Sequence, residues 1–301
     1  MLEFDHYRFL KAAGLLVILA VTVYLFDQHA AAGFGGTWLG YVFGISSALI
    51  IVVLVLYGVR RRLTAKFAER RKSTGSLASQ RIAIDRRVRK ANWRRHHGAT
   101  LRGWLSAHVY FGIALVVLAT LHTGFQFGWN LHTVVYALMM AVIISGVYGI
   151  YAYLRFPRLM TDNMAGDTFE TLLLKIADLD KLASDKSLQF SDAICAVVLK
   201  ACQETRIGGN FFQQLRGRHN CPTTQAVQQM EDLGKDLKDD ELKSFNDLYS
   251  IMAHKENLVT RAWRDVTYRA RMEFGLYLHA PLSIAFLALL IAHIVAIFFY
   301  W

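Results

Sequence analysis

Several common chemical signatures are missing from this 301-residue chain. It has three cysteines, Cys195, Cys202 and Cys221, but no CxxC pair and no CxxCH string, so it supports neither an iron–sulfur cluster nor covalent haem attachment. No GxGxxG fingerprint for a dinucleotide occurs either. All three cysteines lie in a segment that the charge pattern assigns to the cytoplasm, where thiols stay reduced, and we expect no disulfide.

Long apolar runs are abundant. A hydrocarbon core about 30 Å thick needs roughly 20 apolar residues per helix. Five stretches qualify, at about 9 to 26, 38 to 59, 103 to 123, 131 to 154 and 275 to 300. The sequence therefore predicts an all-α fold, a membrane helical bundle of five transmembrane helices with an α-helical cytoplasmic insert.

Charge is segregated along the chain and predicts its orientation. From Arg60 to Arg102 there are fifteen Lys or Arg and only two acidic residues, whereas residues 124 to 130 carry no charge. Because basic loops stay in the cytoplasm, we expect a multi-pass protein of the bacterial inner (plasma) membrane, with its N-terminus cytoplasmic and its C-terminus periplasmic. The net charge of +11 then reflects the basic loop, which sets the topology and contacts anionic membrane lipid. No nucleic acid is expected as a partner.

These patterns divide the chain into five segments. Residues 1–59 hold the first two transmembrane helices, 60–102 a basic cytoplasmic loop, 103–154 transmembrane helices 3 and 4, 155–272 the helical insert, and 273–301 transmembrane helix 5. Helical periodicity predicts three or four helices in the insert, with a turn at Gly208 and Gly209. The insert is either a structural extension or a docking platform for a soluble redox partner.

Four histidines inside the apolar runs carry the functional prediction. His108 and His122 lie fourteen residues apart in the third span, and His279 and His293 have the same separation in the fifth. Fourteen helical residues place two imidazoles about 21 Å apart and about 40° off one helix face. Ionisable side chains inside bilayer helices are rare and are functional hypotheses by default. Each helix is therefore predicted to present two stacked ligands to a neighbour.

The third and fifth spans both begin at the cytoplasm and run parallel, which predicts how these histidines pair. His108 is then level with His279 near the inner surface, and His122 with His293 near the outer surface. One alternative is that each histidine forms a structural hydrogen bond with a neighbouring helix, and another is a zinc or iron transport site. Since the last four spans contain no Asp or Glu, haem, whose porphyrin largely balances the iron charge, is the occupant that needs no acidic ligand.

The histidine pattern resembles that of a known family. On the third span, His108 is followed after three residues by Gly112 and after nine more by His122. Together with the histidine pair on the fifth span, this spacing resembles that of the transmembrane core of the ferric reductase and NADPH oxidase superfamily. The wider di-haem b cytochromes, including the cytochrome b of quinol-oxidising complexes, have a similar pattern. The resemblance covers about residues 100 to 156 and 272 to 301. It implies that His108 and His279 are axial ligands of an inner haem iron, and His122 and His293 of an outer one.

Two further strings, "LHTGFQFG" and "LHAPLS", resemble segments of small bacterial membrane cytochromes b whose redox partners are separately encoded. Two features depart from the oxidase pattern. No flavin and nicotinamide domain follows the fifth span, so we expect that the chain does not oxidise NAD(P)H alone, and the insert is far longer than a simple loop. The expected partners are therefore separate redox subunits, such as iron–sulfur, flavin or c-type cytochrome proteins.

Other residues are candidates for supporting roles. The inner haem propionates could pair with Arg102 or Arg155, or with Arg158 or Arg271, because forked guanidinium donors suit carboxylates, although juxtamembrane arginines also serve as topology signals. The turn with Gln126, Trp129, Asn130 and His132 could cap the outer haem or hold a quinone head group. Small residues either leave space beside a macrocycle or allow close helix packing; they are Gly40, Gly44, Gly112, Ser145, Gly146 and Gly149.

The expected function is a di-haem b cytochrome subunit that carries electrons across the membrane between a cytoplasmic redox partner and a quinone or periplasmic acceptor. Its cofactors are two haem b groups, with a quinone as a further candidate ligand. No catalytic residue is assigned, because irons with two histidine ligands have no vacant site. An alternative is a stand-alone quinone-linked reductase or oxidase of a small molecule, superoxide or a ferric chelate, at the outer haem. A third interpretation is a haem-free membrane scaffold.

Overall fold

The computed structural model describes residues 7–26, 37–73, 101–217, 221–236 and 239–300. Within these ranges every regular element is a helix, which confirms the predicted all-α fold class. Most of the predicted basic loop, residues 74–100, lies outside the described ranges, and so does the side chain of Arg102.

Among the described residues, five helices are long and apolar enough to cross a membrane. They are α1 (Arg8–Phe26), α2 (Trp38–Ser73), α4 (Leu101–Thr123), α5 (Leu131–Met164) and α10 (Asp239–Tyr300). Each contains one of the five apolar stretches predicted from the sequence. Such stretches form helices because a backbone inside hydrocarbon must satisfy its hydrogen bonds within its own segment. The chain is therefore a multi-pass membrane protein.

The chain forms two compact units. The first unit comprises Met1–Ile143 together with Ala285–Trp301, and the second comprises Ile144–Ile284. Helices α5 and α10 pass from one unit into the other. The first unit consequently holds α1, α2, α4, the beginning of α5 and the end of α10.

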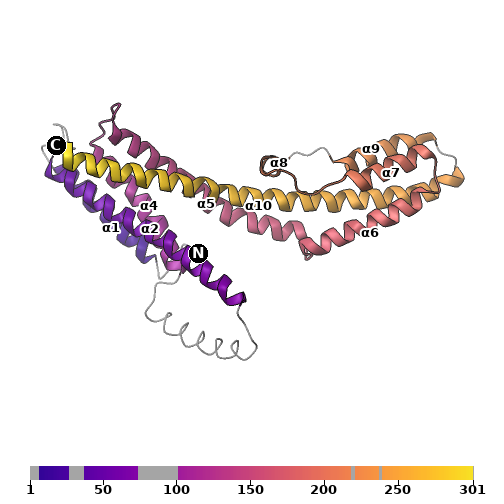
Figure 1. Ribbon diagram of the computed structural model, residues 1–301, viewed down its shortest axis with the longest axis horizontal. Coiled ribbons are helices and arrows are strands. Elements are labelled where there is room, and N and C mark those ends of the chain that lie inside the picture. Colours follow the sequence, from indigo (N-terminus) through magenta and orange to yellow (C-terminus); the bar gives the residue numbers. More distant parts are fainter. Residues whose placement is uncertain (1–6, 27–36, 74–100, 218–220, 237–238, 301) are drawn as a thin grey trace, which may run out of the picture. The chain divides into compact units, whose positions relative to one another are not determined.

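Two apolar clusters hold the first unit together. Alanine and large apolar side chains join α1, α2 and α4, which lie side by side (Figure 1); the buried members are Ala13, Ala20, Leu39, Phe43, Ala114, Leu118 and Leu121. A second cluster joins α2 and α4 to the beginning of α5 and the end of α10, through Ile51, Leu115, Ala119, Val135, Met139 and Phe286. Because this cluster includes four helices, it brings the ends of α4, α5 and α10 to one place.

The second unit packs four short helices on the first half of α10. These are α6 (Phe169–Ser187), α7 (Asp192–Glu204), α8 (Phe211–Arg216) and α9 (Pro222–Leu233). Its main core lies between α6, α7, α9 and α10 (Figure 1) and includes Ala183, Ile194, Val198, Ala201, Ala226, Val227, Met230, Phe245, Leu248 and Met252. Gly208 and Gly209 lie in the connection between α7 and α8, and both have positive φ angles, of 124° and 98°, which glycine adopts without strain.

Helices extend further than the sequence predicted. Helix α2 continues through the basic residues to Ser73, and α5 continues past its span, through Pro157, to Met164. Helix α10 is a single helix of 62 residues that contains both the last part of the insert and the fifth span. Pro281 lies inside it without ending it. The insert and the membrane span thus share a continuous backbone.

Arg261 of α10 closes the C-terminus of α5. Its Nε donates to the carbonyl of Asn163 at 2.9 Å and its Nη2 to the carbonyl of Met164 at 2.5 Å. In return, Nδ2 of Asn163 donates to the carbonyl of Arg261 at 2.8 Å. The last carbonyls of a helix have no partner within the helix and attract cations. This contact therefore satisfies the last carbonyls of α5, and the chain leaves the helix at Ala165 and Gly166, which both have positive φ angles.

A buried lysine stabilises the second unit. The side chain of Lys255 is fully buried, and its ammonium lies 2.5 Å from Oδ1 of Asp180. It also donates to the carbonyl of Ala201 at 3.0 Å and contacts Sγ of Cys202 at 3.7 Å. Burial raises the pKa of the Cys202 thiol to about 11. The thiol is therefore protonated at neutral pH, and the ammonium's charge is balanced by Asp180 instead.

Replacing Lys255 with Met is expected to destabilise the protein by about 3 kcal/mol, because it removes the cation from the partly buried Asp180 carboxylate and the donor from the Ala201 carbonyl. The measurement is the apparent melting temperature of the purified full-length chain in detergent. Lys235→Met is the matched control, since the Lys235–Asp232 pair is exposed and such pairs contribute little. Equal melting temperatures for Lys255→Met and the unaltered protein would contradict this role for Lys255.

Candidate functional site: three converging histidines

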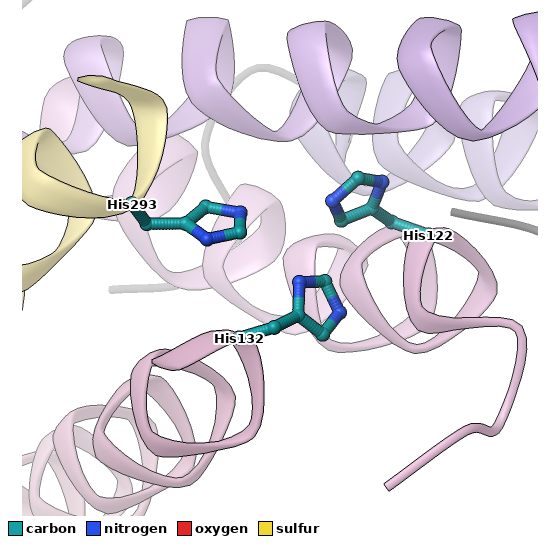
Figure 2. A group of neighbouring side chains, drawn as sticks. All are labelled: His122, His132 and His293. Carbon is teal, nitrogen blue, oxygen red and sulfur yellow. The ribbon is translucent and has the colours of Figure 1, made fainter. Parts of the chain in front are cut away.

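Three imidazoles from three helices meet in the first unit (Figure 2). They belong to His122 on α4, His132 on α5 and His293 on α10. One ring nitrogen of each lies within 4.8 Å of the corresponding nitrogen of the other two. The His132 ring is central, with its centroid 5.2 Å from that of His122 and 5.1 Å from that of His293. All three side chains are partly buried.

This donor set suits a transition metal. Neutral imidazole binds zinc, copper and iron, whereas hard cations such as Mg²⁺ and Ca²⁺ prefer oxygen ligands. Metal–imidazole bonds are about 2.0–2.1 Å long for zinc, so two nitrogens on opposite sides of one ion are about 4 Å apart, and two in a tetrahedral site are closer. The observed limit of 4.8 Å agrees with both arrangements. The three nitrogens can therefore bind one metal centre, either two at a time or all three together.

The backbone of α2 orients His122. Nδ1 of His122 lies 2.7 Å from the carbonyl oxygen of Gly40. Because a carbonyl only accepts, Nδ1 carries the proton and Nε2 keeps its lone pair. Metal-binding histidines almost always donate their second ring nitrogen in this way, which holds the ring and increases its basicity. His122 is thus in the tautomer that a metal ligand requires.

Gly44 makes room for this orientation. A Cβ atom at Gly44 would lie 2.8 Å from Cε1 and 3.1 Å from Nδ1 of His122. Any side chain at this position would therefore displace the ring from the Gly40 carbonyl. The small residues that the sequence analysis named have different surroundings: Gly44 and Gly146 contact histidine rings, whereas Gly112 and Gly149 have open space beside them.

His108 repeats the arrangement of His122 further along the same helix pair. Its Nδ1 lies 3.2 Å from the carbonyl oxygen of Leu54, and its ring lies against Tyr57 at a centroid distance of 5.0 Å. Gly40 and Leu54 are themselves fourteen residues apart, as His122 and His108 are. The antiparallel helices α2 and α4 therefore meet in one register, in which each histidine of α4 has a carbonyl partner on α2.

His279 has a partner of another kind within the second unit. Its Nδ1 lies 2.9 Å from Oγ of Ser145 on α5, and a Cβ at Gly146 would lie 3.4 Å from its Cε1. The hydroxyl of Ser283, one turn further along α10, donates to the carbonyl of His279 at 2.7 Å. The small residues Ser145 and Gly146 thus form the seat of this imidazole.

The structure brings together some of the predicted site residues. His122 and His293 share a cluster, as the spacing predicted. His108 and His279 belong to different units, so their pairing stays a prediction. The side chain of Arg155 is exposed, and the Arg102 side chain lies outside the described part of the chain. Arg271 instead donates from Nε to the carbonyl of Leu215, at 3.3 Å.

The sequence did not place His132 in a cluster with His122 and His293, and assigned it instead to a turn that could cap the outer haem or hold a quinone. The structure places it in the first turn of α5, facing His122 and His293. A signal was present in the chain, because His132 is only ten residues after His122 across a short, uncharged turn. Two histidines that flank such a turn lie at the same end of adjacent antiparallel helices.

Comparison with protein-family models, with curated proteins and with solved structures finds no match for this chain.

Replacing Gly44 with Ala is expected to break the hydrogen bond between His122 and Gly40, because the new methyl group would overlap the ring. The measurement is the ¹⁵N chemical shift of Nδ1 of His122 in histidine-labelled protein reconstituted in lipid. Gly58→Ala on the same helix is the control, since a Cβ atom at Gly58 would have nothing within 4 Å and the shift should not change. An unchanged His122 shift in Gly44→Ala would refute this role of Gly44.

Proposed function

We propose that the chain is a di-haem b cytochrome subunit that carries electrons across the membrane between a cytoplasmic redox partner and a quinone or periplasmic acceptor. One observation carries the proposal. His122 and His293, which the fourteen-residue spacing and the parallel direction of the third and fifth spans predicted to share a site, have ligand nitrogens within 4.8 Å of each other. They come from helices that are separated by more than a hundred residues of sequence.

The ligand chemistry of His122 and His293 suits a haem. A porphyrin between them would occupy the place of the His132 imidazole, whose ligand nitrogen lies within 4.8 Å of both, so haem binding requires the His132 ring to turn aside. When it is bound by two imidazoles, haem supplies reversible one-electron transfer without a vacant iron position. His122 offers Nε2 because the Gly40 carbonyl holds its Nδ1 proton. The three-histidine group contains no carboxylate, and an iron whose charge the porphyrin balances needs none. The protein's own contribution is to hold the rings and to exclude water.

The second haem, with His108 and His279 as ligands, stays a prediction from the sequence. Two observations support it, one in each unit. Nδ1 of His108 has the Leu54 carbonyl as a partner, and Nδ1 of His279 has the Ser145 hydroxyl. Each ring can therefore direct Nε2 to a metal, as His122 does. The repeated register between α2 and α4 places His108 about 21 Å from His122 along α4, so that the two sites would lie at two depths of the bilayer.

The proposed partners are separate redox subunits, and the insert is their proposed docking platform. Mixed charge on an independently packed helical unit supports this role, because exposed charged groups on such a surface guide transient redox complexes. We also propose that Arg102 and Arg155 pair with haem propionates, and that a quinone is a further ligand.

Single replacements of the four ligands test the proposal. His122→Ala or His293→Ala is expected to remove the outer haem and leave about half of the pigment, while His108→Ala or His279→Ala should remove the inner haem. The measurement is haem per chain by the pyridine haemochrome assay, together with the reduced α band. His254→Ala, at an exposed position of the insert, is the control and should retain both haems. Four variants with unchanged haem content would overturn the assignment.

A second candidate function is a metal centre bound by all three histidines. The specific observation in its favour is the convergence of a third imidazole, since two axial ligands suffice for haem. Three neutral nitrogens with an open fourth position form the ligand set of catalytic zinc in carbonic anhydrase. In this candidate, His132 is an essential ligand in its present position; in the haem proposal its ring must turn aside to make room for the porphyrin.

His132→Ala separates the two candidates. If haem occupies the site, the variant should keep two haems per chain, because His122 and His293 remain. If a divalent ion occupies it, the purified protein should contain near-stoichiometric zinc or copper without haem. The variant should then lose metal affinity by on the order of 100-fold or more, since even removing a group that only orients a ligand costs 10–100-fold. Elemental analysis and an optical spectrum of both proteins decide between these outcomes.

A further inference from the structure

The short helix α8 lies against α10 where the fifth span begins. The ring of Phe211 packs edge-on to Tyr277 at a centroid distance of 5.7 Å. Further along α8, the carbonyl of Leu215 accepts a hydrogen bond from Nε of Arg271, and Gly217 lies against the side chain of Thr267. These contacts run in opposite directions along the two helices, so the N-terminus of α8 is its end nearest the membrane. All of them are within the second unit.

The partner of Phe211 already belongs to the apolar span. The last charged residue of α10 is Glu273, and residues 275–300 contain neither Asp, Glu, Lys nor Arg. Tyr277 is in the first turn of this apolar run, two residues before His279. Because Phe211 contacts Tyr277, the N-terminus of α8 lies level with the first turn of the membrane-spanning segment.

An exposed apolar surface surrounds this contact. Phe212, whose ring centroid is 6.1 Å from that of Phe211, has 78% of its surface exposed. On α10, Leu276 and Tyr277 are exposed to 55% and 63% at the same level. Side chains of a span at this level face lipid. Phe212 therefore continues the lipid-facing surface of α10 rather than forming an isolated apolar patch in water.

The polar groups of α8 are suited to the same environment. The backbone N–H of Asn210 donates to Oε1 of Gln213, and the side-chain amide of Gln214 donates to the carbonyl of Gly209. These two bonds satisfy the Asn210 N–H, the Gly209 carbonyl and the side-chain amides of Gln213 and Gln214 in part, at the membrane-facing end of the helix. Arg216, at the other end, is exposed and lies about 6 Å further along the helix axis than Phe212. Phenyl rings at one end and a guanidinium at the other match the acyl and phosphate layers of a membrane interface.

We infer that α8 is an interfacial membrane anchor, in which Phe212 inserts at the boundary between acyl chains and headgroups and Arg216 reaches the lipid phosphates. The anchor holds the loop between α7 and α9 against the bilayer at the base of the helix that carries His279. It does not depend on which cofactor the histidines bind.

The test measures where residue 212 lies relative to lipid. The three native cysteines are replaced with Ala, and Phe212→Cys is labelled with a nitroxide in the full-length chain. The protein is reconstituted in vesicles of phosphatidylcholine and phosphatidylglycerol. Collision rates of the nitroxide are then measured with oxygen, which concentrates in lipid, and with a neutral water-soluble nickel chelate. Because Phe212 is already mostly exposed, the label does not disturb a packed core.

Leu188→Cys is the matched control. Leu188 is an exposed apolar residue of the same unit, with 71% of its surface exposed. It lies next to the end of α6, where Lys186 pairs with Asp247 of α10. Asp247 is thirty residues before Tyr277, which corresponds to about 45 Å along a helix. The control position is thus far from the span along α10.

The expected result is an oxygen-to-nickel collision ratio several-fold higher at position 212 than at position 188. Nickel access at 212 equal to that at 188 would overturn the inference, because the residue would then be in water. Low access to both reagents at 212 would also overturn it, because the side chain would then be covered by protein, such as a second copy of this chain.

Discussion

A polar ring inside a bilayer must find its hydrogen-bond partners within the protein, because water does not reach it. This constraint determines how the histidines of this chain are held. His108 and His122 use backbone carbonyls of α2, and His279 uses the hydroxyl of Ser145. The two carbonyls can only accept, so Nδ1 of His108 and of His122 carries the proton and Nε2 keeps its lone pair, whereas the Ser145 hydroxyl can donate to or accept from His279. These bonds satisfy buried imidazoles and also fix how the rings are oriented.

Helix α2 is the element that makes this arrangement repeat. Its carbonyls at Gly40 and Leu54 have the same fourteen-residue separation as the histidines of α4, so one helix register serves both rings. Helical carbonyls are already bonded within the helix, but each retains a second lone pair. Because Gly44 has no side chain, the His122 ring can reach the second lone pair of the Gly40 carbonyl. Helix α2 thereby positions the imidazole of His122 within the three-histidine cluster.

The second unit is stabilised differently, by charged groups in an α-helical core. Lys255 is buried against Asp180, and Arg261 caps the end of α5. Both residues lie on α10, which also carries His279 and His293. The last part of the insert and the histidine-bearing span therefore belong to one helix, which is charged in its first half and apolar in its second. Helix α8 of this unit contacts α10 between Arg271 and Tyr277, where α10 changes from charged to apolar.

The amino-acid sequence by itself determined the five spans, the helical class and the matching level of His122 and His293, because each follows from local periodicity or from a count of residues. It could not locate His132 in the site, since that depends on the direction in which the first turn of α5 faces after α4 and α5 have packed. Nor could it identify Gly40 and Leu54 as partners, because every helical residue offers the same carbonyl. Only the tertiary structure, through the register between α2 and α4, decided which carbonyls meet a histidine.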